Sequence, residues 1–230
     1  MPAPAQNPAI RALKKARGLA LRMATTHMLP DEVMFLRGPG GRRRVALTLD
    51  DGPDALTPRY LEVLARAGAR ATFFVIGRAC VEHPGELEAI VSAGHEVASH
   101  GFTHTEFTKL TGSALRDELE RTAALLPARG KGRPLVRPPR GFVSPRSLIG
   151  CFLAGYTSAM WSLDTLDWDA RDADEVVERA ARCGVEAGEI ILMHEGRQTS
   201  LDALPRVIEN LQRAGFELVT VSELMDGKPS

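Results

Sequence analysis

Short apolar runs rich in β-branched residues recur along the chain, separated by longer stretches in which apolar and polar residues follow a helical spacing. Apolar runs of this length, bounded by turn-forming residues, are typical of buried strands. The pattern predicts seven strands, at Arg44–Asp50, Ala71–Gly77, Glu96–His100, Leu135–Pro138, Tyr156–Asp164, Glu189–His194 and Phe216–Val221.

Helices are predicted in the amphipathic stretches between these strands. Three stretches are followed at once by a glycine, at Gly68, Gly94 and Gly215. Glycine readily adopts the left-handed conformation that ends a helix. The predicted helices are Pro58–Ala67, Gly85–Ala93, Ser113–Leu126, Pro145–Ala154, Ala173–Cys183 and Leu204–Ala214. Strands that alternate with helices indicate a parallel α/β protein.

The polar residues favour a closed barrel over an open, doubly wound sheet. In a β/α barrel the carboxyl ends of all strands meet at one mouth, whereas in an open sheet they spread along a line. No G-x-G-x-x-G motif follows the first strand, so a dinucleotide-binding fold has no support. Chemistry-bearing residues lie at or just after five predicted strand ends: Asp50, Asp51, His100, His104, Arg137, Asp164, Asp167 and His194.

Length and composition fit one globular domain without disulfides. The chain has 230 residues, of which 44% are hydrophobic and 25% charged, so the bulk of the chain is not disordered. Its three cysteines, Cys80, Cys151 and Cys183, are few and widely spaced. This excludes a disulfide framework and a cysteine-rich zinc module, and it favours a reducing compartment.

A net charge of zero hides an uneven distribution. Residues 1–44 carry a net charge of +7, and the remainder carries −7. We therefore predict a basic N-terminal leader over residues 1–40, with a helix at Ile10–Met23, and a catalytic domain over residues 41–226. The leader could pack on its own acidic domain or contact an anionic membrane surface peripherally. We expect no nucleic acid partner.

The leader lacks the features of a secretory signal. Arg17 and Arg22 interrupt the apolar run that the core of a signal peptide needs. The chain also has no run of about 18 apolar residues, the length that spans a bilayer. We therefore expect a cytoplasmic protein that contacts the inner membrane face at most peripherally.

Two adjacent carboxylates, Asp50 and Asp51, end the first predicted strand. Like charges in a buried place repel each other and need a positive partner, although Asp-Gly-Pro alone is also typical of a turn. His100 and His104 could supply that partner by binding a divalent metal ion together with one carboxylate. Zn²⁺ suits such a set best, with Co²⁺, Ni²⁺ or Mn²⁺ possible. The second carboxylate would then be free to accept a proton from water.

Hydrolysis also needs an acid for the leaving group, and His194 is the candidate. Asp164 or Asp167 could keep its imidazole cationic and oriented, although a buried structural histidine is the alternative. Arg137 could hold the free aspartate, or it could be a surface arginine beside a proline turn. Trp168 lies in a polar loop, where it could stack on a sugar ring.

Five motifs in this order resemble the NodB-homology polysaccharide deacetylases, carbohydrate esterase family four. The likeness covers about residues 43–225. The motifs are Thr-Leu-Asp-Asp-Gly (48–52), His-x-x-x-His (100–104), Arg-Pro-Pro-x-Gly (137–141), Asp-Thr-Leu-Asp-Trp (164–168) and Leu-Met-His (192–194). The resemblance implies a distorted (β/α)7 barrel, one divalent metal ion, and removal of N-acetyl groups from an aminosugar in an N-acetylated glycan.

The resemblance also implies a role for each motif residue. Asp50 corresponds to the general base, His194 to the general acid, and Arg137 to the arginine that holds the base. Asp51, His100 and His104 correspond to the metal ligands. Asp167 corresponds to the residue that tunes His194, with Asp164 left as the alternative. Trp168 and Leu192 would shape the acetyl pocket, and the backbone N–H at Arg140 would join the oxyanion hole.

Three positions depart from the family pattern. Arg140 stands where an aromatic residue is usual, which adds charge at the rim and could select an anionic substrate. Gly101 replaces a Ser or Thr whose hydroxyl would brace the loop, and Leu49 replaces a commoner phenylalanine without expected effect. None of these changes removes a ligand or a proton carrier, so we expect activity to persist.

Other functions remain possible at this point. One alternative is an N-deformylase or another C–N hydrolase that acts on a modified sugar, and another is a non-catalytic carbohydrate-binding relative. A phosphatase with an aspartate nucleophile would need Asp-x-Asp spacing rather than Asp-Asp with two histidines. Without a recognisable signal segment we expect an intracellular or lipid-linked glycan rather than wall peptidoglycan.

Overall fold

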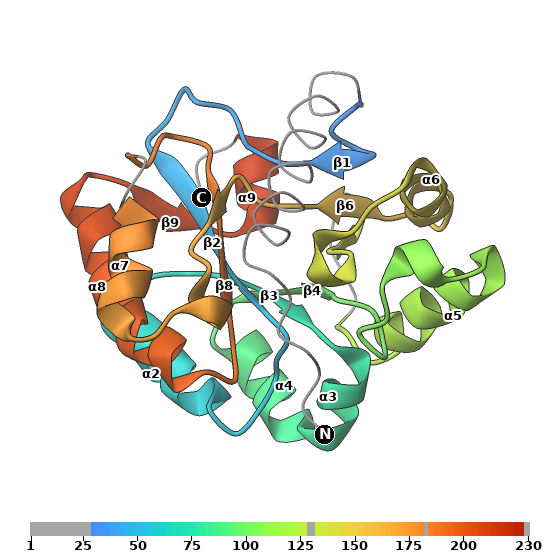
Figure 1. The fold of residues 1–230 in the computed structure, drawn as a ribbon, viewed down its shortest axis with the longest axis horizontal. Coiled ribbons are helices and arrows are strands. Elements are labelled where there is room, and N and C mark those ends of the chain that lie inside the picture. The colour runs from blue at the N-terminus through green and yellow to red at the C-terminus, as the bar shows by residue number, and fades with distance from the viewer. Residues whose placement is uncertain (1–28, 128–131, 182–183, 228–230) are drawn as a thin grey trace.

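A curved parallel sheet forms the centre of the protein in a computed structural model that describes residues 29–127, 132–181 and 184–227. Within those residues the strand order is β1-β6-β5-β4-β3-β2-β8-β7, and β9 pairs with β2 (Figure 1). The strands are β1 (Met34–Phe35), β2 (Arg44–Asp50), β3 (Thr72–Val75), β4 (Glu96–Ser99), β5 (Leu135–Val136), β6 (Thr157–Ala159), β7 (Leu163–Asp164), β8 (Ile190–His194) and β9 (Glu217–Val219).

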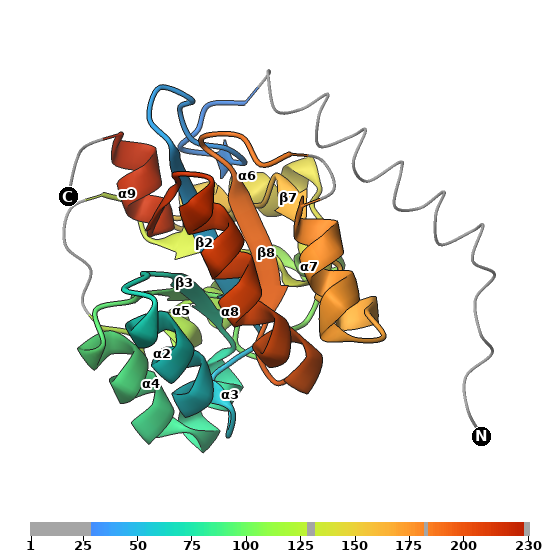
Figure 2. The same cartoon turned by 90° about the vertical axis from the view of Figure 1, so that its left-hand side faces the viewer.

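Helices surround this sheet. They contact one another in the order α7, α8, α2, α4, α3, α5, α6, so that each packs on the next around the outside. Figure 2 shows α2, α7 and α8 on the side of the sheet that faces the viewer. The helices are α2 (Thr57–Arg66), α3 (Gly77–Glu82), α4 (Pro84–Ser92), α5 (Gly112–Ala123), α6 (Pro145–Leu153), α7 (Ala173–Ala181), α8 (Gln198–Arg213) and α9 (Val221–Asp226), with 3-10 turns η1 (Phe107–Lys109), η2 (Pro139–Gly141) and η3 (Asp167–Asp169).

The connection between β6 and β7 shows that the sheet must curl. These strands lie six positions apart in the strand order, which is about 29 Å across a flat sheet. Yet Ala159 and Leu163 are separated by only three residues, which reach about 14 Å when extended. The sheet therefore curls far enough to bring β6 and β7 within reach of each other, as the distorted barrel predicted from the sequence requires. The single strand predicted at Tyr156–Asp164 is wrong, because this run forms both strands.

Alternation along the strands separates an outer core from the barrel interior. Leu47 and Leu49 of β2 belong to the core beneath the helices, together with Met193 of β8. The intervening residues point to the other face, because successive side chains of a strand alternate. Parallel pairing aligns Asp50 with His194 at the last position of β2 and β8. The fold thus carries both residues to the same end of the barrel interior.

The folded sheet begins earlier than residue 41, where we placed the domain boundary. Met34 and Phe35 are both buried, and as β1 they pair with β6. The predicted helix at Ile10–Met23, and the membrane contact proposed for it, lie outside the described residues. In the described part of the chain, no helix has the length and apolar character needed to cross a membrane.

Candidate active site

Arg137 and Asp50 form an ion pair inside the barrel. The Arg137 side chain is fully buried, and its Nη1 donates to Asp50 Oδ1 at 2.6 Å and to Thr48 Oγ1 at 2.7 Å. Nε and Nη2 donate to the backbone carbonyls of Ala159 and Met160. These bonds leave the guanidinium well satisfied, which is the condition for burying a charge at tolerable cost. The surface-arginine alternative is therefore wrong.

The environment of Asp50 suits a residue that accepts a proton. Burial is the main influence and raises its pKa above the ordinary value, while Arg137 and His194 act in the opposite direction. A carboxylate that is held ionised by a fixed partner, yet made more basic by burial, is a suitable general base. Asp50 Oδ2 also lies 3.8 Å from His100 Nε2, so the carboxylate is next to the adjacent histidine cluster.

Asp51, His100 and His104 converge on one point. One possible ligand atom from each lies within 4.8 Å of the corresponding atoms of the other two. Asp51 Oδ1 is 3.5 Å from His100 Nε2 and 3.2 Å from His104 Nε2. The same oxygen is buried and accepts no hydrogen bond from the described residues. A buried carboxylate oxygen that faces two imidazole nitrogens in this way fits a shared cation.

The protonation state of His100 also fits a metal ligand. Its Nδ1 lies 2.7 Å from the carbonyl oxygen of Arg137, which leaves Nε2 as the nitrogen directed at the cluster. Burial lowers the pKa of His100 to about 3, so the ring is neutral at physiological pH. A neutral imidazole whose second nitrogen is held by a carbonyl is the usual form of a metal-ligating histidine.

His194 is paired with Asp167 on the opposite side of the site. His194 Nδ1 donates to Asp167 Oδ1 at 2.7 Å, and the His194 backbone N–H donates to Oδ2. Ser200 of α8 donates to the same Oδ2 at 2.6 Å. Asp164, the alternative partner, instead accepts a hydrogen bond from the backbone N–H of Leu166. Of the two candidates, Asp167 is the carboxylate in contact with His194.

The charges of this pair support each other. Burial alone would lower the pKa of His194, but the hydrogen bond and charge of Asp167 raise it to about 9. Burial likewise acts against ionised Asp167, and the hydrogen bonds from His194 and Ser200 nevertheless keep its pKa below the ordinary value. His194 is therefore cationic at neutral pH, as a group that donates a proton to a leaving amine must be.

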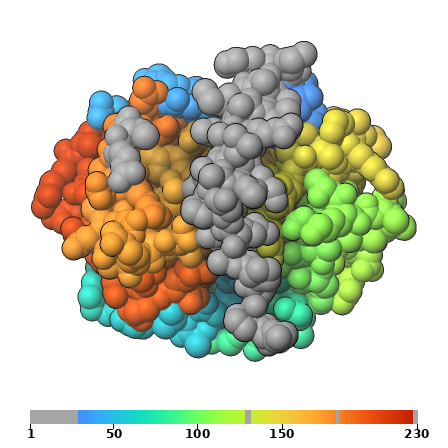
Figure 3. All heavy atoms as spheres, in the orientation of Figure 1, coloured from blue at the N-terminus to red at the C-terminus, as the bar shows by residue number. Residues whose placement is uncertain are grey.

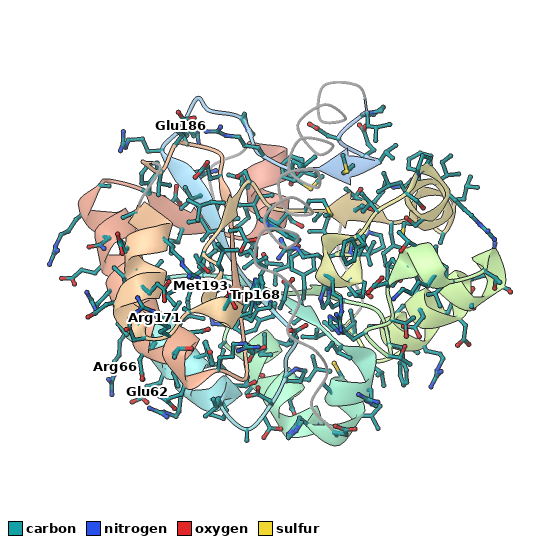
Figure 4. The ribbon with its side chains drawn as sticks, in the orientation of Figure 1. Glu62, Arg66, Trp168, Arg171, Glu186 and Met193 are labelled. Carbon is teal, nitrogen blue, oxygen red and sulfur yellow. The ribbon has the colours of Figure 1, made fainter. Side chains whose placement is uncertain are left out.

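Three further candidate residues lie around this arrangement. Arg140 is exposed and has a left-handed backbone with φ 58°, and its Nε lies 3.9 Å from Glu106 Oε1. Trp168 is exposed on η3, next to Asp167. Figure 4 shows Trp168 toward the middle of the view, whereas Arg171 lies nearer the outer side. Leu192 is buried and is aligned with Thr48 of β2, two residues below His194.

Figure 3 shows how the helices on the outside of the barrel divide between the two sides of the molecule. Helices α7 and α8, in orange and red, occupy one side of this view, and α5 and α6, in green and yellow, occupy the other. The site residues come from both halves, because the curled sheet brings β2, β4, β5 and β8 together.

Sequence reasoning missed Ser200. We predicted that the last long helix begins at Leu204, whereas α8 begins at Gln198 and includes this serine in its first turn. Its hydroxyl is fully buried against Asp167. A polar residue that follows His194 by only six positions was the available signal. Its meaning depends on how the intervening turn folds.

The observed fold and site define a β/α barrel whose candidate chemistry lies at the carboxyl ends of its strands. The profile of the family described as polysaccharide deacetylase matches residues 37–159. The chain belongs to this family, the NodB-homology group of carbohydrate esterase family four, as its motifs predicted.

Two named relatives illustrate the range of the family. The peptidoglycan-N-acetylglucosamine deacetylase PgdA of Listeria monocytogenes is 33% identical over 87% of this chain. The match spans 43% of that protein, so this chain covers less than half the length of the relative. The chitooligosaccharide deacetylase of a Bradyrhizobium strain is 33% identical over 80% of this chain and 91% of its own length.

Solved structures agree with this assignment. The Bc1960 peptidoglycan N-acetylglucosamine deacetylase superimposes with a TM-score of 0.78 at 28% identity, covering 85% of this chain and 94% of that one. A protein described as a family-four pseudoenzyme, from Bacillus anthracis, gives a TM-score of 0.79 at 28% identity, covering 88% and 72%. Family membership alone therefore does not establish activity, which depends on the residues of the site.

Proposed function

We propose that this protein is a metal-dependent hydrolase that removes N-acetyl groups from an aminosugar in a glycan. The observation that carries the proposal is the arrangement around Asp50. A candidate metal cluster lies on one side of this Arg137-paired carboxylate, and the cationic His194 ends the neighbouring strand. A base, an acid and a cation site within one barrel mouth are the parts that amide hydrolysis needs.

Asp51, His100 and His104 would hold the cation, for which Zn²⁺ is the best fit to two imidazoles and one carboxylate. When bound, such an ion makes water more acidic and polarises a carbonyl. Asp50 accepts the proton of the attacking water as the new C–O bond forms. Arg137 keeps Asp50 ionised before that transfer and holds its carboxylate in place.

His194 completes the reaction by donating its proton to the departing nitrogen as the C–N bond breaks. The products are acetate and a free aminosugar. Asp167 keeps His194 cationic and oriented, and Ser200 supports Asp167. The backbone N–H at Arg140 is our candidate donor to the oxyanion, and Trp168 and Leu192 are our candidates for the acetyl pocket.

The Asp50→Asn variant tests the central role. We expect turnover to be abolished while zinc content, measured by atomic absorption, stays at one ion per chain. Asp117→Asn, an exposed change on α5, is the matched control and should keep wild-type turnover. Acetate release by Asp50→Asn at a rate near that of the wild type would contradict the assignment of the base.

The substrate can be identified by a screen. Peptidoglycan fragments and chito-oligosaccharides enter because relatives are named for them. Lipid-linked N-acetyl sugars enter because the sequence led us to expect an intracellular or lipid-linked glycan, and nucleotide-linked N-acetyl sugars extend the screen. Acetate and formate are both measured, with and without a chelator. Chelator-sensitive acetate release supports the proposal, whereas formate release would identify an N-deformylase.

A non-catalytic carbohydrate-binding relative is the second candidate, because the solved neighbours include a pseudoenzyme. The residues of this chain argue against it, since each proposed ligand and proton carrier is present. Binding of a glycan without release of acetate or formate from any substrate in the screen would support this second candidate.

A further inference from the structure

Residues 100–104 carry two of the three proposed metal ligands, and the two are held differently. His100 directly follows β4, and its ring is fixed through the carbonyl of Arg137. His104 comes four residues later, after a turn, with a left-handed backbone of φ 61°. Its ring contacts the other two members of the cluster, Asp51 and His100. The position of His104 therefore depends on how the intervening turn is held.

One side of this turn is held by backbone hydrogen bonds. The carbonyls of Gly101 and Phe102 accept hydrogen bonds from the backbone N–H groups of Gly77 and Arg78, both at 2.9 Å. These two donors lie in the first turn of α3. The packing is close, because a Cβ added at Gly77 would lie 2.5 Å from the Phe102 ring.

The other side is held by a single carboxylate, that of Glu118 on α5. Its Oε2 accepts from the backbone N–H groups of Phe102 at 2.7 Å and Thr103 at 2.9 Å. Its Oε1 accepts from Thr103 Oγ1 at 2.6 Å. Glu118 is 94% buried, since only 6% of its surface is exposed. Three donors to one buried carboxylate offset the cost of its desolvation and fix the turn in one conformation.

Gly101 allows this approach. A Cβ at this position would lie 3.1 Å from Glu118 Oε2 and 3.1 Å from Cε1 of Phe107, and the backbone is left-handed with φ 79°. In the family pattern a Ser or Thr at this position would brace the loop through its hydroxyl, which glycine lacks. The structure places a carboxylate from another helix against the same turn.

We propose that Glu118 is a positioning residue for metal binding, which sets the place of His104 by bracing residues 102 and 103. The inference rests on the metal site of the proposed function. Groups that orient a metal ligand without binding the metal themselves commonly contribute about 10-fold to 100-fold to metal affinity. Loss of the brace should therefore weaken cation binding without removing a ligand.

The test is a titration of the metal-free protein with Zn²⁺ against a chromophoric chelator. Glu118→Ala removes the brace, and Glu118→Asp keeps the charge but shortens the side chain. Glu118→Gln keeps the length: its amide oxygen can accept from both backbone N–H groups, and its amide nitrogen can donate to Thr103 Oγ1. The Thr103 hydroxyl can then donate to Thr105 Oγ1, 2.7 Å away. Glu120→Ala, an exposed change on the same helix, is the control.

We expect Glu118→Ala and Glu118→Asp to weaken Zn²⁺ binding by about 10-fold to 100-fold. Glu118→Gln should stay within about threefold of the wild type, and Glu120→Ala should be unchanged. Circular dichroism of each metal-free variant establishes that it is folded. If Glu118→Ala does not fold, the comparison of Glu118→Asp with Glu118→Gln decides.

Two results would overturn the inference. Folded Glu118→Asp that binds Zn²⁺ as tightly as the wild type would show that the brace does not set the position of His104. A loss in Glu118→Gln as large as that in Glu118→Asp would show that the three hydrogen bonds, which glutamine can keep, do not account for the effect. Absence of Zn²⁺ binding by the wild type would instead contradict the proposed function itself, and this outcome is distinct from the first two.

Discussion

Replacing Asp167 by asparagine isolates what its charge does to His194. Asparagine keeps a similar volume and an oxygen that can accept from His194 Nδ1, but it removes the negative charge. In the wild type that charge and hydrogen bond raise the pKa of His194 from 6.5 to about 9, against the effect of burial. With that charge gone, burial still lowers the pKa of His194 and only Asp50 and Asp51 still raise it, so the pKa should fall from about 9 toward its ordinary value of 6.5.

The size of the effect follows from these values. A shift of about 2.5 pKa units corresponds to roughly 3 kcal/mol. At pH 7 the cationic fraction of His194 should fall from about 99% toward about 25%, the value for a pKa of 6.5. Loss of a well-placed general acid typically lowers a rate by about 10²-fold to 10⁴-fold. The alkaline limb of the pH–rate profile, near pH 9 in the wild type, should move down toward pH 6.5 in Asp167→Asn.

The same values predict how stability depends on pH. The folded-state pKa of His194 lies above its unfolded value, so the stabilisation from the Asp167 pair is fully present below pH 6.5 and is lost as pH rises through 9. The difference in unfolding free energy between the wild type and Asp167→Asn should therefore narrow by roughly 3 kcal/mol over that interval. Urea denaturation at a series of pH values measures it.

The assay is initial-rate acetate release between pH 5 and 10, with imidazole NMR of His194 as an independent readout. Asp164→Asn is the matched control, because Asp164 accepts from the backbone N–H of Leu166 and should not move the alkaline limb. An alkaline limb that stays near pH 9 in Asp167→Asn, or that moves equally in Asp164→Asn, would refute the reasoning.

Three further predictions concern stability. Arg137→Met leaves Asp50 buried without its partner and should lower the free energy of unfolding, measured by urea denaturation, by about 3–5 kcal/mol. A loss below about 1 kcal/mol would contradict this prediction. Burial raises the pKa of Glu195 from 4.5 to about 8, so wild-type stability falls as pH rises from 4.5 through 8. Metal-free Glu195→Gln should fall less steeply over this range than the metal-free wild type, keeping only the part that His194 contributes above pH 6.5, and equal pH dependence in both proteins would contradict this. Gly52→Ala should lower stability by about 1–3 kcal/mol, since its Cβ would lie 1.7 Å from Glu195 Oε2, whereas Gly85→Ala, with open space around it, should change little.

Much of the fold follows from periodicity, because the strongest strands are long apolar runs. The prediction for Arg44–Asp50 matches β2 at both ends. The shorter elements could not be located in this way. Strand β1 has two residues and takes its place from pairing with β6, and α3 begins within the stretch predicted as a strand at Ala71–Gly77. Tertiary packing determines such short elements, and local pattern does not reveal it.

The predicted partner of Asp50 could be identified from chemistry, since a buried carboxylate needs a cation and Arg137 lies at the end of another strand of the sheet, β5. The choice between Asp164 and Asp167 could not. Asp164 ends β7 and Asp167 lies three residues later, and the left-handed backbone at Leu166, with φ 53°, comes between them. This turn determines which carboxylate reaches His194, and the sequence carries no glycine to mark it. Ser200 and Glu118 lie on helices, and the residues that these two side chains contact become known only once the fold is known.

Backbone strain is concentrated in the motifs. Among the described residues, the non-glycine residues with positive φ are Asp51, His104, Arg140 and Leu166. Each lies in a different one of the first four motifs on which the family resemblance rests. Such conformations cost about 1–3 kcal/mol each and persist only where the surroundings enforce them. The site is therefore the part of the chain where local preference is overridden.

Asp50 and Asp51 show what this strain achieves. A regular strand would direct adjacent side chains to opposite faces of the sheet. Asp51 instead turns at φ 79°, and both carboxylates approach the same atom, His100 Nε2, at 3.8 Å and 3.5 Å. One carboxylate is held by Arg137 and the other faces His100 and His104, so two chemically identical neighbours receive different environments. The division of labour that we propose, one base and one ligand, depends on this single left-handed residue.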